Sequence, residues 1–394
     1  MWDETVTGGW IAPDKFACVD CVDSKHLKNA IRESSDTSTV CDYCSNGPAA
    51  HLSAVLQPIS QTLNRYFQHP DAAGIPLDKG DWVINPMDTF DALMQLPLAC
   101  NDVLFEDLAN AFCNDCWVSA GGIWSGIYHR HERLANAWDH FEEMAKHRAR
   151  YFLGSNIEIW EFDPGNEFLQ PTALLDAVGR YVRKFNLIRT LNSKLTLYRA
   201  RHSKNGAAYS SFDEMGPPPK DAAKAGRMNA AGIPYFYLAR ERRTAIAEVA
   251  SHPPGKLVIG SFKLNRAIPV LDLTCLEEPP SLFDDDAYER RQSILFLRDF
   301  VQRIASPVRK DGREHVEFVP SQVVSEYFSE MFASPEGDGR IGGMVYPSTV
   351  IPPGQNVVLF PPRDWDKWEK IATLDSTEEL EFENWQELIS EIRP

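Results

Sequence analysis

The sequence predicts an α+β protein in which a helical N-terminal half precedes a domain built on a small mixed β-sheet with flanking helices. Between about residues 51 and 190, apolar side chains recur at three- and four-residue spacings, which is the period of an amphipathic helix. From about residue 195 onward, short apolar runs typical of strands alternate with helical stretches. Helices gathered in one half and strands in the other favour α+β organisation.

Composition divides the chain into four regions. Residues 1–50 are rich in Cys, Asp and Ser and poor in large aliphatic side chains, so we expect a small cysteine knuckle there. Residues 51–190 form the helical region, and residues 191–362 carry the strands. Residues 363–394 are acidic and contain Trp385, and we expect this tail to form a short helix.

In the third region, loop residues separate the elements that we expect. Gly216-Pro217-Pro218-Pro219 must be a loop, because proline cannot donate a backbone hydrogen bond. The expected strands are Leu195–Tyr198, Tyr235–Leu238, Leu257–Leu264, Ile268–Leu273, Gly343–Tyr346 and Val357–Phe360, and the expected helices are Ala245–Ala250, Tyr288–Ile304 and Ser321–Phe332.

Charge and hydropathy exclude several classes of protein. The 394 residues include 40 Lys and Arg against 56 Asp and Glu, a net charge of −16, so nucleic acid is an unfavourable partner. No apolar stretch approaches the roughly 18 residues that a membrane span needs, and no signal peptide is recognisable at the N-terminus. Of the eight cysteines, six form Cys-x-x-Cys pairs, which suits a reducing compartment. We expect a cytoplasmic protein.

The two N-terminal cysteine pairs predict a structural zinc site. Cys18-x-x-Cys21 and Cys41-x-x-Cys44 enclose a loop of zinc-ribbon length. Four thiolates fill every position of a tetrahedral ion and leave none open for a substrate, so the metal would contribute to folding. The alternative is four unrelated cysteines, which this spacing disfavours.

A third pair, Cys113 and Cys116, lies in a helical pattern without a second knuckle nearby. Thioredoxin-like redox chemistry would require such a pair after a strand, at the start of a helix. We therefore favour two buried helical cysteines.

The helical region resembles a HEPN domain, a family of RNA-cleaving proteins that pair an arginine with a histidine across four intervening residues on one helix. Here six residues separate Arg133 from His140, and three separate Arg65 from His69. A separation of nearly two turns still places Arg133 and His140 on one helix face, but a solvated helix face is the favoured explanation. The expectation is a HEPN-like domain without a complete active site.

The second half of the chain, roughly residues 190–362, carries a more extensive resemblance. Its segments in order are Leu197-Tyr198-Arg199-Ala200, Gly226-Arg227-Met228-Asn229 with the Tyr237-Leu238-Ala239 strand that follows, Ala245-Ile246-Ala247-Glu248-Val249, and Tyr346-Pro347-Ser348 followed by Asn356-Val357-Val358-Leu359-Phe360, with Pro320-Ser321-Gln322 before the last helix. Together they resemble the RES domain, a bacterial toxin family related in fold to ADP-ribosyltransferases. The resemblance implies an NAD-consuming enzyme. Met228 replaces the family's tryptophan, and we expect an acidic insertion at residues 277–286 to reshape the mouth of the pocket.

The chemistry of NAD cleavage suggests roles for these residues. Breaking the nicotinamide–ribose bond passes through an oxocarbenium-like state, which a carboxylate stabilises, and Glu248 is the candidate. Apolar neighbours in the sequence predict that Glu248 is partly buried. An arginine at a strand end clamps phosphate oxygens with two donors, so Arg199 would hold the diphosphate. The remaining candidates for contacts to NAD are Tyr209, Arg227, Asn229, Tyr237 and Ser348, with Tyr237 and Ser348 grouped with the catalytic residues.

The leading hypothesis is a toxin or phage-defence effector that hydrolyses NAD or transfers ADP-ribose from it. Because such an activity is lethal without restraint, we expect an antitoxin or regulatory protein as partner, or restraint in cis by the N-terminal half; a homo-oligomer is compatible with the sequence. Two alternatives stay open. One is a HEPN-type RNA-cleaving protein in which the RES half is a scaffold, and the other is a non-catalytic zinc-ribbon adaptor.

Overall fold

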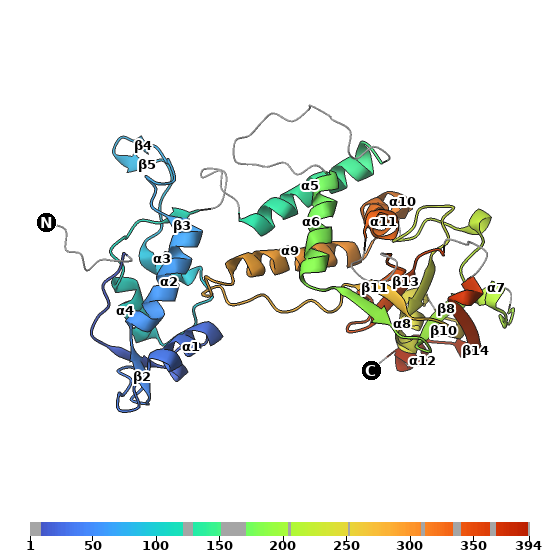
Figure 1. Cartoon of the computed structure of the whole chain (residues 1–394), viewed down its shortest axis with the longest axis horizontal. Helices are drawn as coiled ribbons and strands as arrows, with labels where there is room; N and C mark the ends of the chain where they lie inside the picture. Colours follow the sequence, from blue (N-terminus) through green and yellow to red (C-terminus); the bar gives the residue numbers. More distant parts are fainter. Residues whose placement is uncertain are drawn as a thin grey trace. The chain divides into compact units, whose positions relative to one another are not determined.

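The computed structural model describes residues 9–120, 129–150, 171–203, 206–250, 253–308, 312–333, 340–362 and 368–392 (Figure 1). The chain divides into two compact units. Of the described residues, the first unit contains those up to Arg133 together with Glu278–Leu295, and the second contains the rest. Among the described residues, the dividing points fall inside helices α5 (Arg130–His147) and α9 (Tyr288–Ala305) and between Glu277 and Glu278. None of the described helices combines the length and apolar composition that crossing a bilayer requires.

The first unit is a small helical body with short ladders of strand. Its helices are α1 (Lys25–Ser34), α2 (Ser53–Tyr66), α3 (Thr89–Met94) and α4 (Asp102–Asn110), with a short 3₁₀ turn at Val19–Cys21. Its two-stranded ladders pair β1 (Phe16–Cys18) with β2 (Ala49–His51), β3 (Phe67–Gln68) with β6 (Val118–Ser119), and β4 (Leu77–Asp78) with β5 (Asp81–Trp82).

Apolar side chains at helical spacing and a capping residue account for the helices of the first unit. Leu56, Ile59 and Leu63 follow one another at helical spacing on α2 and are fully buried. Asn101 caps α4 by accepting hydrogen bonds from the amides of Val103 and Leu104, which otherwise lack helical partners. The cysteines of the first knuckle are buried in the same core.

The acidic insertion at residues 277–286 belongs to the first unit, which corrects our expectation that it shapes the pocket mouth. Phe283 is 1% exposed and packs in the core of that unit. The carbonyl of Leu282 accepts a hydrogen bond from Thr62 on α2, and Asp285 pairs with Arg65. A long segment within the C-terminal half of the sequence therefore completes an N-terminal core.

The second unit is built on one eight-stranded mixed sheet. Its strands lie in the order β14-β10-β8-β9-β13-β12-β11-β7, and every pair is antiparallel except β11 with β12. The strands are β7 (Ile188–Leu191), β8 (Thr196–His202), β9 (Phe236–Ala239), β10 (Gly255–Leu264), β11 (Ile268–Asp272), β12 (Gly343–Pro347), β13 (Gln355–Leu359) and β14 (Ala372–Phe382). The six expected strands are all present. β7 and β14, at the two edges, were not predicted.

Helices and turns of the second unit surround this sheet. They are α6 (Pro171–Lys184), α7 (Phe212–Met215), α8 (Arg242–Val249), α10 (Glu314–Glu317), α11 (Val319–Glu326) with a π-helical turn at Tyr327–Met331, and α12 (Trp385–Ile392), with short 3₁₀ turns at Lys220–Ala222 and Trp368–Lys370.

Strand β14 replaces part of the helix that we expected in the acidic tail. The acidic side chains of this edge strand meet lysines of β10: Lys256 pairs with Glu379 and Glu381, and Lys263 pairs with Asp375. Ala372 and Phe382, at the two ends of the strand, are buried. An exposed acidic run gives little sequence signal for a strand, because its register here is set by pairing with β10. The helix itself is confined to α12.

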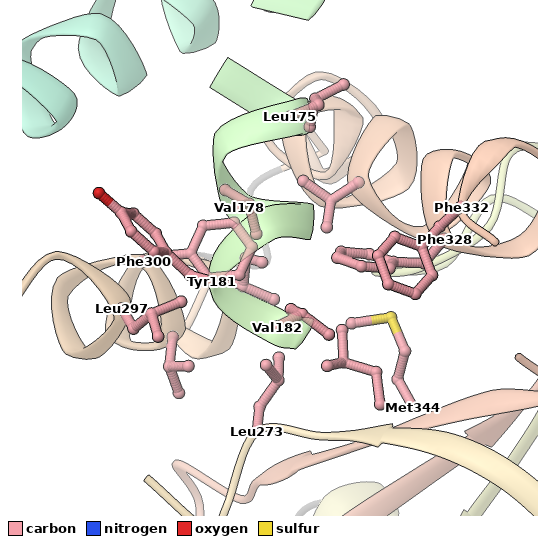
Figure 2. Packing of buried hydrophobic residues seen from close by; sticks show 14 of the residues in the cluster. Leu175, Val178, Tyr181, Val182, Leu273, Leu297, Phe300, Phe328, Phe332 and Met344 are labelled. Carbon is pink, nitrogen blue, oxygen red and sulfur yellow. The ribbon is translucent and has the colours of Figure 1, made fainter. Parts of the chain in front are cut away.

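Helix α6 packs against the sheet through one apolar face. Val178, Tyr181 and Val182 are buried, at spacings that share a face of the helix. Figure 2 shows these side chains between Leu273 and Met344 on the sheet side and aromatic residues of neighbouring helices. The contacts of α6 therefore place it in the second unit, although its sequence lies within the helical region.

Burial of Phe283 predicts a measurable cost of removing it. Phe283→Ala should destabilise the first unit by about 3–5 kcal/mol, because it leaves a cavity in a closed core. Differential scanning calorimetry would detect the change as a lower unfolding temperature of that unit. Phe90→Ala is the matched control, since Phe90 is 45% exposed and its loss should cost much less. Equal effects of the two substitutions would contradict burial of the insertion.

Candidate functional site

A cavity of about 430 Å³ lies where the main sheet splits. Strands β8 and β9 share only one paired position, Tyr198 with Ala239, and the ladder does not continue to Arg199 and Leu238. The two strands therefore diverge beside β13 and helix α8. The side chains lining the cavity include Tyr198, Arg199, Arg201, His202, Tyr237, Glu248, Tyr346 and Asn356.

Helix α8 brings Glu248 to this cavity. Ala245 and Ile246 are buried where the helix packs on the sheet, and Glu248 lies on its last turn. The residue is exposed, which corrects our expectation of partial burial. One carboxylate oxygen, Oε1, accepts two hydrogen bonds of 2.7 Å, from the hydroxyl of Ser348 and from the amide of Asn356.

Ser348 holds Glu248 from a tight turn between β12 and β13. Its side chain is 3% exposed, and its hydroxyl oxygen also accepts from the amides of Val350 and Ile351. Its own amide donates to the carbonyl of Gly354, which closes the turn. Ser348 thus contacts the candidate carboxylate and is not among the residues that line the cavity.

Tyr237 presents its ring to the cavity, while its hydroxyl is engaged behind it. The hydroxyl donates to Oδ1 of Asn229 at 2.7 Å and accepts from the amide of Met228 at 2.9 Å. Burial raises the pKa of Tyr237 well above its usual value, so the phenol stays neutral. In this arrangement the ring face, rather than the hydroxyl, is available for a ligand.

Hydrogen bonds fix the segment Gly226–Asn229, and this segment positions Tyr237. Gln322 of α11 donates to the carbonyls of Gly226 and Asn229. A Cβ at position 226 would lie 2.6 Å from Oδ1 of Asn229 and 2.7 Å from the Tyr237 hydroxyl, so only glycine fits. The Asn229 amide donates to three further carbonyls, those of Lys224, Ala230 and Ile233. Asn229 is therefore a buried structural contact of Tyr237 and lies outside the cavity lining.

Three other candidate residues lie away from the cavity lining. Arg227 donates to the carbonyls of Ile304 and Ser306, at the end of α9. Tyr209 packs beside the core on one face of the sheet. Met228 is fully buried in the main core of the second unit, so the replacement of tryptophan changes core packing there.

Arg199 lies on the cavity wall and is engaged only by a carbonyl and an aromatic ring. It donates to the carbonyl of Gly216 at 2.7 Å and lies over the ring of Phe236. Burial, reinforced by the nearby charge of Arg201, lowers the pKa of Arg199 to about 9, so the guanidinium remains charged at neutral pH. Within the described residues no carboxylate pairs with it.

Comparison with protein families assigns the two halves of the chain. Residues 196–383 match the RES domain model, and residues 34–158 match HEPN/RES N-terminal domain 1. The chain therefore contains a RES domain preceded by a HEPN/RES N-terminal domain. No curated protein and no solved structure gives a significant match. The RES domain match includes β14, and the family indicates NAD-related enzymatic activity in general.

Sequence reasoning did not single out Arg201 and Asn356, two residues that line the RES cavity. Arg201 repeats Arg199 two residues later on the same strand, and that spacing is the signal for a shared face. Asn356 lies opposite Tyr346 in the pairing of β13 with β12. No local pattern shows that either of these two meets Glu248 or the cavity, because strand pairing decides it.

In the N-terminal region, the four cysteines of the two knuckles come together. Their sulfur atoms all lie within 4.8 Å of one another, with Cys18 3.3 Å from Cys44 and Cys21 3.7 Å from Cys41. Tetrahedral zinc with Zn–S bonds of ~2.3 Å separates its ligands by roughly 3.8 Å, so the donor set fits such an ion. Four sulfur ligands would make the metal structural.

Cys113 and Cys116 are not the buried helical pair that we favoured. Helix α4 ends at Asn110, and both cysteines follow in an irregular segment. Cys113 is exposed and Cys116 is half-buried. The helical period that continues to Phe112 is interrupted by Asn114, whose side chain hydrogen-bonds the backbone of Cys116 in a turn.

The sulfur cluster predicts bound zinc at about one equivalent. Cys41→Ser should release the metal and unfold the first unit before the second, because the binding energy of the metal contributes to folding. Elemental analysis and calorimetry measure both effects. Cys275→Ser is the matched control, since Cys275 is exposed and lies outside the cluster. Freshly purified, never-chelated protein without zinc would contradict the site.

Proposed function

We propose that the RES domain cleaves the nicotinamide–ribose bond of NAD, either by hydrolysis or by transfer of ADP-ribose. The observation that carries the proposal is the arrangement of one cavity. It combines a carboxylate held by two donors, a tyrosine ring and arginines without carboxylate partners among the described residues. These are the three kinds of group required by a dinucleotide with a cationic nicotinamide ring and a negatively charged diphosphate.

Glu248 is the proposed catalytic carboxylate. Its Oε1 is occupied by Ser348 and Asn356, and no hydrogen bond from a described residue engages Oε2. A fixed carboxylate stabilises the cationic ribose carbon of the transition state without having to reorganise. Its attraction grows as charge develops at that carbon, which lowers the barrier. Ser348 and Asn356 then act as positioning residues for this oxygen pair.

Tyr237 and Arg199 are the proposed binding residues. The ring of Tyr237, fixed from behind by Asn229, offers a flat face for stacking on the nicotinamide. Arg199 keeps its charge at neutral pH and can direct paired N–H donors at phosphate oxygens. Binding energy from these remote groups would orient the ribose beside Glu248.

The proposed biological setting is a toxin or phage-defence effector in the cytoplasm. Loss of NAD stops central metabolism, so the activity needs a restraint, supplied by an antitoxin, a regulatory protein or the chain's own N-terminal half. The HEPN-type domain with its zinc knuckle is the proposed regulatory or targeting part. The acceptor of ADP-ribose is water or a protein.

A second candidate function, RNA cleavage, is favoured by a polar network in the first unit. Nδ1 of His129 lies 2.8 Å from the Tyr288 hydroxyl, and Nδ1 of His131 donates to Gln292 at 2.5 Å. Arg65 lies over the ring of Tyr288 and pairs with Asp285. Burial lowers the pKa of His129 and so favours its neutral form. A neutral imidazole can accept a proton. A structural role in joining α2, α5 and α9 explains the same contacts.

Incubating the intact protein separately with NAD and with RNA distinguishes the two functions. Release of nicotinamide supports the first, and RNA fragments that disappear in His129→Ala support the second. The proposal of NAD cleavage fails if purified, folded protein releases no nicotinamide, with or without its zinc.

Glu248→Gln should abolish NAD consumption and leave the fold intact. The change is nearly isosteric and removes the negative charge beside the reacting carbon, a loss of roughly 3 kcal/mol or about 100-fold in rate. Affinity for NAD should change little, because this contact matters most in the transition state. Arg199→Lys is the comparison variant, expected to weaken NAD binding as well as turnover. Near-full activity of folded Glu248→Gln would reject the assignment.

Asn356→Asp should lower kcat for NAD cleavage more than it changes KM. The substitution replaces an N–H donor with a second negative charge beside Oε1, so Glu248 is repelled from the position in which Asn356 holds it. Asn356→Ala removes the donor without adding charge and should lower kcat by a smaller factor, with little change in KM. Steady-state kinetics on both folded variants measures the effect, and near-parent kcat in both would contradict the positioning role.

A further inference from the structure

Two arginines of β8 lie on the cavity wall and converge on one short segment of backbone. Arg199 donates to the carbonyl of Gly216 at 2.7 Å. Arg201 donates to the same carbonyl at 2.8 Å and to the carbonyl of Glu214 at 2.5 Å. Two residues apart on one strand, they project from the same face of the sheet. The result is a pair of guanidinium groups around a single carbonyl oxygen.

Neither arginine has a carboxylate partner among the described residues. The whole chain carries a net charge of −16, so acidic side chains are abundant, yet none of those that the structure describes forms an ion pair with Arg199 or Arg201. Both side chains are half-buried, and burial lowers the pKa of Arg201 as well as that of Arg199. Two neighbouring cations withdrawn from water are unfavourable unless an anion joins them.

Capping of helix α7 does not account for both arginines. The helix spans four residues, and its start is already closed by a capping box between Ser211 and Glu214. At its end, the amide of Gly216 bonds the carbonyl of Phe212. A Cβ at position 216 would lie 2.6 Å from that carbonyl oxygen, so the turn is shaped by glycine and not by the arginines.

The position of the pair indicates an elongated ligand. Helix α8, which carries Glu248, packs on the face of the sheet formed by Ala200 and Ala239. Arg199 and Arg201 have the opposite parity on β8 and project from the other face, the face of Leu197. A ligand that meets both Glu248 and the arginines therefore extends through the split between β8 and β9.

We propose that Arg201 completes a two-arginine clamp for a diphosphate, which selects dinucleotides over nicotinamide nucleosides and mononucleotides. The inference rests on the proposed function and adds the residue that determines substrate class. When the diphosphate binds, the guanidinium groups exchange the Gly216 carbonyl for phosphate oxygens. Two positive charges match the two negative charges of the diphosphate, and each planar guanidinium can bond two oxygens. Arg201 is a specificity-determining residue, outside the bond-breaking chemistry.

Arg201→Gln tests the clamp with three substrates that share the scissile bond. NAD carries a diphosphate, nicotinamide mononucleotide one phosphate, and nicotinamide riboside none. The glutamine amide can still donate to the Gly216 carbonyl, but it lacks the positive charge and the paired N–H donors of a guanidinium group. We expect kcat/KM for NAD to fall about tenfold or more, chiefly through KM, and kcat/KM for nicotinamide riboside to stay within about twofold. Arg266→Gln, in the exposed turn after β10, is the matched control.

Equal losses on all three substrates would show a structural role and overturn the clamp, as would an unchanged KM for NAD. Calorimetric titration with ADP-ribose gives a readout that does not depend on turnover. Tenfold weaker ADP-ribose binding by Arg201→Gln than by Arg266→Gln supports the clamp even if the parent protein releases no nicotinamide, an outcome in which only the proposed function fails. Equal ADP-ribose affinities overturn the clamp while leaving NAD cleavage standing.

Discussion

The geometry of the candidate site depends on two short hydrogen bonds to one oxygen of Glu248. They come from Ser348 and Asn356, about a hundred residues away in the sequence, on the turn and strand that follow β12. An exposed carboxylate on the last turn of a short helix would otherwise sample several rotamers. With Oε1 held from two directions, the remaining oxygen has a defined place beside the cavity. Catalytic groups gain from such fixed geometry, because no reorganisation is needed during reaction.

The same design recurs behind Tyr237. Its hydroxyl hydrogen-bonds Asn229 and the backbone amide of Met228. Gln322 in turn hydrogen-bonds the loop that carries both residues. The cost of burying these polar groups is offset because each finds a partner. Asn229, which the family resemblance assigned to ligand binding, therefore contacts Tyr237 and lies outside the cavity lining. Its hydrogen bond fixes the ring face that Tyr237 presents to the cavity.

The insertion at residues 277–286 illustrates how far sequence order can mislead about domain membership. It interrupts the RES half of the sequence, yet Phe283 completes the core of the first unit. The segment is acidic and rich in proline, which is typical of a surface loop, and only one large aromatic side chain hints at burial. Among the described residues, the chain passes between the two units within α5, between Glu277 and Glu278, and within α9.

Local patterns alone determined the fold class, the six inner strands and the four-cysteine cluster. Each rests on short-range spacing: apolar periods of two or 3.6 residues, and two residues between paired cysteines. Family resemblance added Arg199, Tyr237 and Glu248, which the cavity brings together. Tertiary structure decided the rest. Edge strand β14 acquires its register from β10, Asn356 and Arg201 reach the cavity because β8 and β9 diverge, and Arg227 is consumed by carbonyls of α9. These outcomes depend on which strands pair and where a ladder stops, and no local stretch of sequence encodes either.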